Sequence, residues 1–177
     1  MKKALVVIDM QNDFITGPLG SPQARAIVPK VAEKLKVYED VIFTRDTHDE
    51  QYLETSEGKR LPVPHCLKDS EGWQIAGELD VDYSDLNIRI FDKGTFGSLE
   101  LAEFLCARRF DEVELVGLVS SVCVVSNALI LRTYLPETKI TVDAACTAGV
   151  TDEDYRASLC VMKMCHIDII NEELSNE

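Results

Sequence analysis

The feature that most constrains the fold is a recurring alternation of strand-like and helix-like segments. Runs dominated by Val, Ile and Leu alternate with segments whose apolar residues recur at helical spacing. The predicted strands are residues 3–10, 40–46, 87–93, 112–118, 139–144 and 167–170, and the predicted helices are 22–36, 97–110, 121–135 and 152–165. Strands that are apolar along most of their length belong to parallel sheets covered by helices on both faces.

The sequence therefore predicts an α/β fold with a doubly wound, mainly parallel six-stranded sheet and helices on both faces. We expect a single domain over residues 1–170, followed by a polar tail at 171–177. The first helix contains Pro29, which removes a backbone donor and predicts a break or restart there.

Charged or reactive side chains stand where several of the predicted strands end. Asp9 follows the apolar run "LVVI", Asp46 and Lys93 close the second and third strands, and Cys123 comes shortly after the fourth. A carboxylate at the end of a buried strand is costly unless it has a partner. In doubly wound sheets the active site lies beyond the carboxyl ends of the strands. We therefore expect these four side chains to meet at one edge.

Composition narrows the class of function. The chain has 177 residues, which is enough for one domain with a hydrophobic core. Its net charge of -13 argues against nucleic-acid binding, which requires a basic surface. The N-terminal apolar run is too brief for a signal peptide, and none reaches the ~18 residues of a membrane span. We expect a cytoplasmic protein with reduced cysteines and with no nucleic-acid or membrane partner.

Cys123 has the local setting of a nucleophile. The stretch "GLVSSVCVVSNALI" passes from a strand through small residues into a helix, which places Cys123 near the helix start. The helix dipole there favours an anion and predicts a lowered thiol pKa. Backbone N–H groups of Val119 and Cys123 would form an oxyanion hole. The alternative, a packed core cysteine, is the commoner situation for a cysteine taken alone.

Lys93 and Asp9 could both assist catalysis if they lie beside this thiol. An ammonium group at Lys93 would stabilise a thiolate, and a carboxylate at Asp9 would accept the thiol proton and later deliver it to a leaving amine. Taken alone, Lys93 could equally be an exposed lysine at the end of a strand. Asp9 could be a turn residue or a helix cap.

A possible metal site lies in the long connection over residues 47–86. Asp46 and His48 are two positions apart and His65 follows two rigid prolines, Pro62 and Pro64, with Glu54 or Glu57 as a fourth ligand. Imidazole and carboxylate groups suit zinc, iron or manganese. Two of the chain's three histidines fall here, and the alternative is a solvated loop with chance histidines. His166 stands apart, and we expect it to be structural.

Together, these motifs resemble those of the isochorismatase-like cysteine hydrolases, and of the nicotinamidases within them. The resemblance covers nearly the whole chain and rests on "VVIDMQNDF", "DTH" followed by "PHC", "DKGTF" and "VGLVSSVCV". It implies a catalytic triad of Asp9, Lys93 and Cys123 and a non-proline cis peptide just before Val119. It further implies a small-molecule amide substrate, a role in NAD salvage, and a homodimer or larger homo-oligomer.

The metal distinguishes branches of this family. Nicotinamidases hold one divalent ion, which binds the pyridine nitrogen, whereas several other branches lack it. The resemblance assigns Asp46, His48 and His65 as ligands, with Glu54 as the variable ligand and Glu57 in reserve. It implies zinc first, with iron or manganese as alternatives, and hydrolysis of nicotinamide through a Cys123 thioester.

The sequence also departs from the nicotinamidase pattern. No Trp precedes the last metal histidine in "RLPVPH", and Ser121 and Val122 precede Cys123 in place of the usual Asp with His or Tyr. Phe14 and Phe96 are the expected ring contacts, with Trp73 a further candidate.

Three other functions compete with this interpretation. A metal-free C–N hydrolase of the same family would act on another small amide or ureido compound. A non-catalytic relic of the fold would bind a metal or a partner, but it has no physical reason to keep three charged or reactive groups on one edge. A phosphatase with an aspartate nucleophile needs a second acid at position 11, which is Gln11.

Overall fold

The protein is built on one parallel sheet of six strands. The computed structural model describes residues 1–79, 81 and 87–172. The strand order β3-β2-β1-β4-β5-β6 is that of a doubly wound sheet, as predicted. The strands are β1 (Lys3–Ile8), β2 (Asp40–Asp46), β3 (Ile88–Lys93), β4 (Glu112–Leu118), β5 (Lys139–Ala148) and β6 (Asp168–Ile170).

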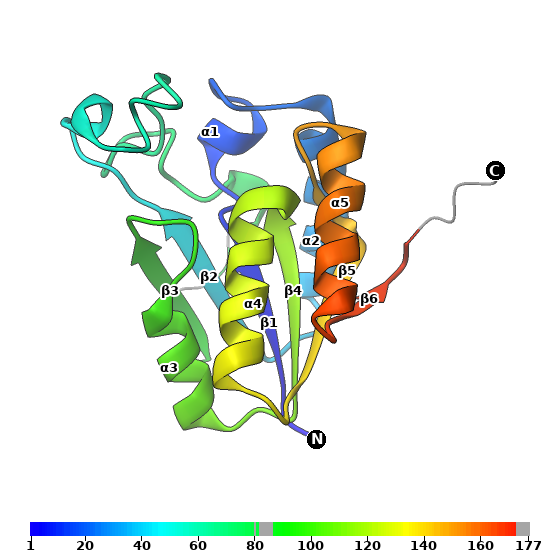
Figure 1. Ribbon diagram of the computed structural model, residues 1–177. Helices are drawn as coiled ribbons and strands as arrows, with labels where there is room; N and C mark the ends of the chain where they lie inside the picture. Colours follow the sequence, from blue (N-terminus) through cyan, green and yellow to red (C-terminus); the bar gives the residue numbers. More distant parts are fainter. Residues whose placement is uncertain (80, 82–86, 173–177) are drawn as a thin grey trace.

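Helices cover both faces of this sheet (Figure 1). The α-helices are α1 (Asn12–Ile15), α2 (Pro22–Leu35), α3 (Leu99–Arg108), α4 (Val125–Tyr134) and α5 (Asp152–Met164). Helices α3, α4 and α5 pack on one face, and α1 and α2 pack on the other. In the described part of the chain, none of the helices is long and apolar enough to span a membrane.

Strand β1 shows why the sequence favours this arrangement. Ala4, Val6 and Ile8 face the core beneath α3, α4 and α5, whereas Leu5 and Val7 face the core beneath α2. All five side chains are fully buried. After the exposed Lys3, this strand is apolar at every position and has no face to offer to water, so it lies in the interior of a two-sided sheet. Its neighbours β2 and β4 are both parallel to it.

The predicted break at Pro29 is wrong, because α2 runs without interruption over Pro22–Leu35. Its start is fixed by Ser21, whose side chain accepts a hydrogen bond from the backbone of Ala24. Pro29 lies on the exposed side of the helix, while Val28 and Val31 on the other side are buried against the sheet. Burial of that apolar face offsets the backbone hydrogen bond that proline cannot donate.

Strand β5 is longer than predicted and extends to Ala148. Its register with β4 shifts between Leu115 and Gly117. Gly117 has a φ of 113°, and a Cβ atom there would lie 2.1 Å from the carbonyl oxygen of Ile8. Only glycine permits this close approach of β4 to β1.

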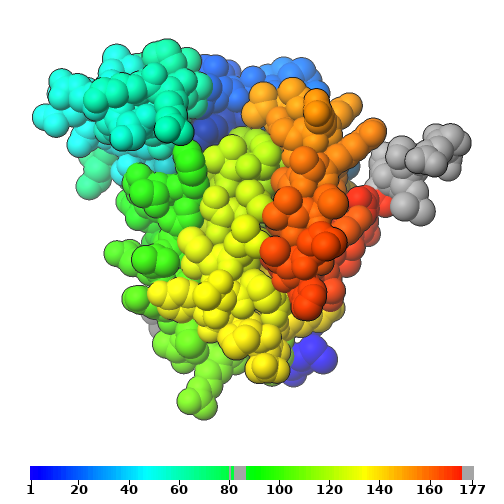
Figure 2. Space-filling model, viewed as in Figure 1, coloured from blue at the N-terminus to red at the C-terminus, as the bar shows by residue number. Residues whose placement is uncertain are grey.

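The long connection after β2 projects beyond the carboxyl ends of β2 and β3. It contains two short 3-10 helices, η1 (Tyr52–Glu54) and η2 (Gly77–Leu79), and the described residues 47–79 form the cyan and teal region of Figure 2. The remainder of the predicted 47–86 connection, at 80 and 82–86, lies outside the described residues, as does most of the predicted tail, at 173–177.

Candidate active site

Asp9, Lys93 and Cys123 meet at the carboxyl edge of the sheet. Asp9 follows β1, Lys93 ends β3, and Cys123 lies in the π-helical turn η3 (Ser120–Val124) between β4 and α4. Strand order reverses between β1 and β4, so the group lies at the topological switch point, where doubly wound sheets bind ligands. All three side chains are at least 95% buried.

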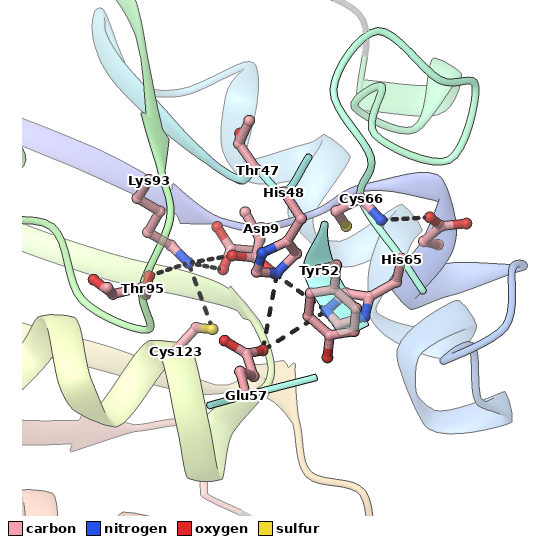
Figure 3. Close-up of polar contacts among 12 residues, drawn as sticks. Asp9, Thr47, His48, Tyr52, Glu57, His65, Cys66, Lys93, Thr95 and Cys123 are labelled. Carbon is pink, nitrogen blue, oxygen red and sulfur yellow. Dashed lines mark hydrogen bonds and ion pairs between the residues drawn. The ribbon is translucent and has the colours of Figure 1, made fainter. Parts of the chain in front are cut away.

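Lys93 joins the other two groups. Its Nζ lies 2.6 Å from Oδ2 of Asp9 and 3.6 Å from Sγ of Cys123 (Figure 3). The ammonium also donates to the carbonyl oxygen of Thr95 at 3.1 Å. Burial alone would lower the pKa of Lys93, but the neighbouring Asp9, Cys123 and Asp46 raise it above its ordinary value. Lys93 is therefore a permanent cation between the acid and the thiol.

Asp9 is held in an unusual backbone conformation. Its φ is 47°, in the left-handed region that residues other than glycine seldom adopt and that often marks functional sites. The hydroxyl of Thr44 donates to its Oδ1 at 2.6 Å, while Oδ2 contacts Lys93. Burial raises the pKa of Asp9, and Lys93 and Thr44 act in the opposite direction. The raised pKa makes the carboxylate a better base than an ordinary aspartate.

The turn that carries Cys123 is tied to the loop after β3. The side chain of Asn127 donates to the carbonyl oxygens of Cys123 and Phe96, at 2.8 and 3.1 Å. The same side chain accepts from the backbone N–H of Ser98 at 3.0 Å. The peptide bond between Leu118 and Val119 is cis, as the sequence resemblance implied.

The expected low pKa of Cys123 is contradicted by its surroundings. Burial and the charge of Asp9 raise the thiol pKa well above its ordinary value, despite the opposing effect of Lys93. The prediction from the helix start took no account of how deeply Cys123 is buried, with 5% exposure, or of the neighbouring carboxylate. Cys123 therefore rests as a thiol and needs a base to become a nucleophile.

A second group of four side chains adjoins Lys93. One ligand atom from each of Asp46, His48, Glu57 and His65 lies within 4.8 Å of the others. Oδ2 of Asp46 lies 2.9 Å from Nε2 of His48 and 3.4 Å from Nε2 of His65. Oε1 of Glu57 lies 3.9 Å from both imidazole nitrogens. Two imidazoles and two carboxylates around one point are a suitable donor set for a divalent transition metal.

The structure corrects the expected fourth member of this group from Glu54 to Glu57. Glu54 ends the 3-10 helix η1 and its side chain is exposed. The chain then turns back, because Thr55 accepts a hydrogen bond from the backbone of Gly58. This turn directs Glu57 toward the two histidines (Figure 3).

Neighbouring residues that are not members of this group orient its side chains. Nδ1 of His65 lies 2.7 Å from the carbonyl oxygen of Val63, which leaves Nε2 to face Asp46. The buried side chain of Gln11 accepts from the backbone N–H of Asp46 and donates to its carbonyl oxygen, at 2.7 and 2.8 Å. Tyr52 is buried with its ring 4.6 Å from that of His48 and 4.9 Å from that of His65.

Electrostatics distinguish the members of this second group. Burial would raise the pKa of Asp46, but hydrogen bonds from His48 and His65 hold it well below its ordinary value. Burial raises the pKa of Glu57, and the charge of Asp46 adds to this effect. Burial would lower the pKa of His65, but Asp46 and the Val63 carbonyl raise it. The negative charge of Asp46 thus attracts a cation, either a proton or a metal ion.

A cavity of about 870 Å³ reaches Cys123 of the first group and Asp46, Glu57 and His65 of the second, all of which line it. Phe14 and Phe96, the expected ring contacts, both line it. Trp73 lies elsewhere, with its ring 3.5 Å from the Arg45 guanidinium and its indole N–H bonded to Thr47.

The sequence did not reveal three residues that shape the site. Thr44 bonds to Asp9, Gln11 fixes the backbone of Asp46, and Asn127 holds the Cys123 turn. All three are polar side chains with at most 1% exposure. A polar residue inside an apolar strand, as Thr44 is in "DVIFTRD", is the signal that could have identified the first.

Comparisons with known proteins agree with this arrangement. The family model described as "Isochorismatase domain" matches residues 3–173. The chain is similar to the nicotinamidase/pyrazinamidase of Mycobacterium tuberculosis, with 27% identity over 188 residues that cover 95% of this chain and 98% of that protein.

Two solved structures share the fold over nearly the full length of both chains. The pyrazinamidase/nicotinamidase of Streptococcus mutans has a TM-score of 0.84 and 27% identity, covering 95% of this chain and 99% of that one. The pyrazinamidase of Pyrococcus horikoshii, solved in complex with zinc, has a TM-score of 0.80 and 25% identity, covering 97% of this chain and 100% of that one.

Proposed function

The chain belongs to the isochorismatase family of hydrolases, and we propose that it is a metal-dependent nicotinamidase that converts nicotinamide and water to nicotinic acid and ammonia. The observation that carries this proposal is the position of Lys93. Its Nζ contacts Asp9 and Cys123 and lies 3.7 Å from Oδ1 of Asp46, so one ammonium connects the acid and thiol to the four-ligand group. The nicotinamidases and pyrazinamidases among its relatives support the choice of substrate.

The donor set supports a resident zinc ion. Asp46, His48, Glu57 and His65 offer two nitrogen and two oxygen ligands, which suit tetrahedral zinc, and the similar pyrazinamidase from P. horikoshii was solved with zinc. When bound, the ion supplies a Lewis-acid contact that orients the ring of the substrate. Iron or manganese would suit the same ligands.

Acylation begins with proton transfer from Cys123 to Asp9. The raised pKa of both groups makes the thiol the resting form and Asp9 a competent base. As the proton moves to the carboxylate, the sulfur attacks the carboxamide carbon, and backbone N–H groups of Val119 and Cys123 hold the developing oxyanion. Asp9 then gives its proton to the departing nitrogen, which leaves as ammonia, and a thioester remains on Cys123.

Deacylation uses the same carboxylate. Asp9 accepts a proton from water, and the hydroxide attacks the thioester carbon. The carbon–sulfur bond breaks, nicotinic acid is released, and Asp9 returns its proton to the sulfur. Lys93 stays protonated throughout, stabilises each anion in turn and holds Asp9 in place.

The direct test is to trap the thioester. Rapid acid quenching during turnover of nicotinamide, followed by intact-mass analysis and peptide mapping, should show a nicotinoyl adduct on Cys123. Cys123→Ala should be nearly inactive while it still binds zinc. Turnover without an adduct at Cys123 in any quench, or an active Cys123→Ala enzyme, would contradict the mechanism.

Asp9→Asn tests the proposed base separately. A positioned general acid–base contributes ~10²–10⁴ in rate, so this variant should lose at least 100-fold in kcat. Wild-type turnover in Asp9→Asn would assign Asp9 a structural role only.

A further inference from the structure

The active-site cavity is larger than nicotinamide requires. Its volume of about 870 Å³ is near the upper end of the ~300–1,000 Å³ typical of sites for drug-sized ligands. Asp46 ends β2 and Val150 follows β5, and both line it. Strands β2, β1, β4 and β5 are adjacent, so the cavity crosses three strand spacings, or about 14 Å. A single ring with one carboxamide is shorter than this.

The charged side chains of the cavity lining all come from one segment of the chain. Every charged lining residue, namely Asp46, Glu57, Arg60 and His65, comes from residues 46–65. The described lining from outside that segment is uncharged and mostly apolar. A ligand group that extends beyond the reacting ring, away from residues 46–65, would therefore meet uncharged and mostly apolar side chains.

At the rim of the cavity, three large apolar side chains of the lining are exposed to water. Leu61, Phe96 and Val150 are 37%, 45% and 67% exposed and all line the same cavity. Apolar lining groups that are exposed to water mark a surface that a ligand covers. A pyridine ring held at Cys123 and the four-ligand group would leave much of this rim uncovered.

The extra group cannot be attached to the leaving nitrogen. In the proposed mechanism that nitrogen receives its proton from Asp9, which is fully buried. Among the described residues, neither Asp9 nor Lys93 is part of the cavity lining, so packed protein lies on the leaving-group side. The free volume is therefore available to the acyl part of the substrate alone.

We propose that this site accepts aromatic carboxamides larger than nicotinamide, in which a second, neutral apolar ring extends from the reacting ring to the rim formed by Leu61, Phe96 and Val150. This inference rests on the proposed amidase function. It adds a substrate class and makes the three rim residues determinants of specificity. The amide itself stays primary, because the leaving nitrogen faces Asp9.

A suitable probe is 5-phenylnicotinamide. Its phenyl group is meta to both the ring nitrogen and the carboxamide, so it obstructs neither. Burial of an aromatic group against the rim should improve binding at least tenfold over nicotinamide. We expect this gain in two measurements, the KM of the zinc-loaded wild-type enzyme and the Kd of zinc-loaded Cys123→Ala by calorimetry, where no turnover occurs.

Rim variants and a matched control locate the second ring. Val150→Ser should reduce the preference for 5-phenylnicotinamide over nicotinamide severalfold, because it replaces part of the apolar rim with a hydroxyl. Val37→Ser is the control, since Val37 is 75% exposed and lies outside the cavity. It should leave the preference unchanged. Both changes are at exposed positions, so the fold should tolerate them.

The outcomes separate this inference from the proposed function. If nicotinamide is hydrolysed through Cys123 but the phenyl compound binds no better, the inference fails and the proposed function stands. If Cys123→Ala binds neither compound and the enzyme hydrolyses neither, both fail. If the phenyl compound alone is hydrolysed, the inference holds and the substrate proposed above is corrected. An equal loss of the preference for 5-phenylnicotinamide in Val37→Ser and Val150→Ser would also overturn the inference.

Discussion

The hydroxyl of Thr44 donates a hydrogen bond of 2.6 Å to Oδ1 of Asp9 from the neighbouring strand β2. Because this bond engages Oδ1 and Lys93 contacts Oδ2, the two oxygens of the carboxylate are distinguished. Oδ2 of Asp9 is therefore the oxygen beside the Lys93 ammonium, and the same ammonium contacts Cys123. Thr44 thus positions the proposed base without touching the substrate.

Thr44→Val should lower kcat by about tenfold or more and leave KM nearly unchanged. Hydrogen bonds to charged groups are typically worth ~1.5–3 kcal/mol, and valine keeps the shape of threonine. The backbone N–H of Asp9 also donates to the Thr44 carbonyl, so strand pairing is retained. Steady-state kinetics of Thr44→Val and Thr44→Ser provide the comparison, with recovery expected in Thr44→Ser. A merely structural role would be indicated if both variants lost stability but kept wild-type kcat.

The assignment of Glu57 to the metal group gives a second prediction with a built-in control. Glu57→Gln should weaken zinc binding by at least tenfold, since even the outer partners of metal ligands contribute ~10–100-fold to affinity. Glu54→Gln changes the same chemical group three residues earlier, at an exposed position outside the group, and should bind zinc as the wild type does. Chelator competition measures both affinities. Equal loss in the two variants, or loss in Glu54→Gln alone, would remove Glu57 from the site.

Metal binding should weaken as the pH falls. A metal ion binds neutral imidazole, and Asp46 together with the Val63 carbonyl raises the pKa of His65 above 6.5. Protons therefore compete from a higher pH than for an ordinary histidine, and apparent affinity should fall roughly tenfold for each pH unit below that raised pKa. Zinc titrations from pH 8 to 5.5 test this. An affinity that stays constant over this range would show that His65 is not a ligand.

The contribution of His65 to the stability of the metal-free protein should change with pH in the opposite direction, increasing as the pH falls. A group whose folded-state pKa is raised stabilises the fold at pH values below its unfolded pKa and loses that contribution as the pH rises through the folded value. His65 thus favours the metal-free fold at low pH and the metal-bound fold at high pH. Denaturant unfolding with and without zinc, at pH 5.5 and 8, separates the two contributions.

The sequence predicted the sheet and the site edge because both depend on local pattern. Short continuous apolar runs such as "LVVI", repeated between helical segments, indicate interior parallel strands, and the carboxyl ends of parallel strands lie on one edge. What local pattern could not supply was the depth of burial. The pKa of Cys123 rises because the whole site is enclosed beside Asp9, which no single segment reveals. Likewise, the choice of Glu57 over Glu54 depends on the turn made after η1.

A partly buried charge network on the α2 side of the sheet is independent of the active site. Lys34 of α2 lies 2.5 Å from Glu114 of β4 and 2.6 Å from Asp143 of β5. The hydroxyl of Tyr38 donates to the other oxygen of Glu114 at 2.7 Å. Burial would lower the pKa of Lys34, but the two carboxylates raise it. Burial and Glu114 raise the pKa of Tyr38.

Lys34→Ala should destabilise the protein by about 3 kcal/mol, because it leaves two buried carboxylates without their cation. Lys36→Ala is the matched control: its pair with Glu33 is exposed and should contribute ~0–1 kcal/mol. Since the folded-state pKa values of Lys34 and Tyr38 are raised, their stabilisation is complete below about pH 10 and is lost as the pH rises further. Urea unfolding at pH 8 and pH 11 should therefore show a smaller difference between wild type and Lys34→Ala at pH 11. An unchanged difference would mean that Lys34 stabilises through packing of its alkyl chain and not through its charge.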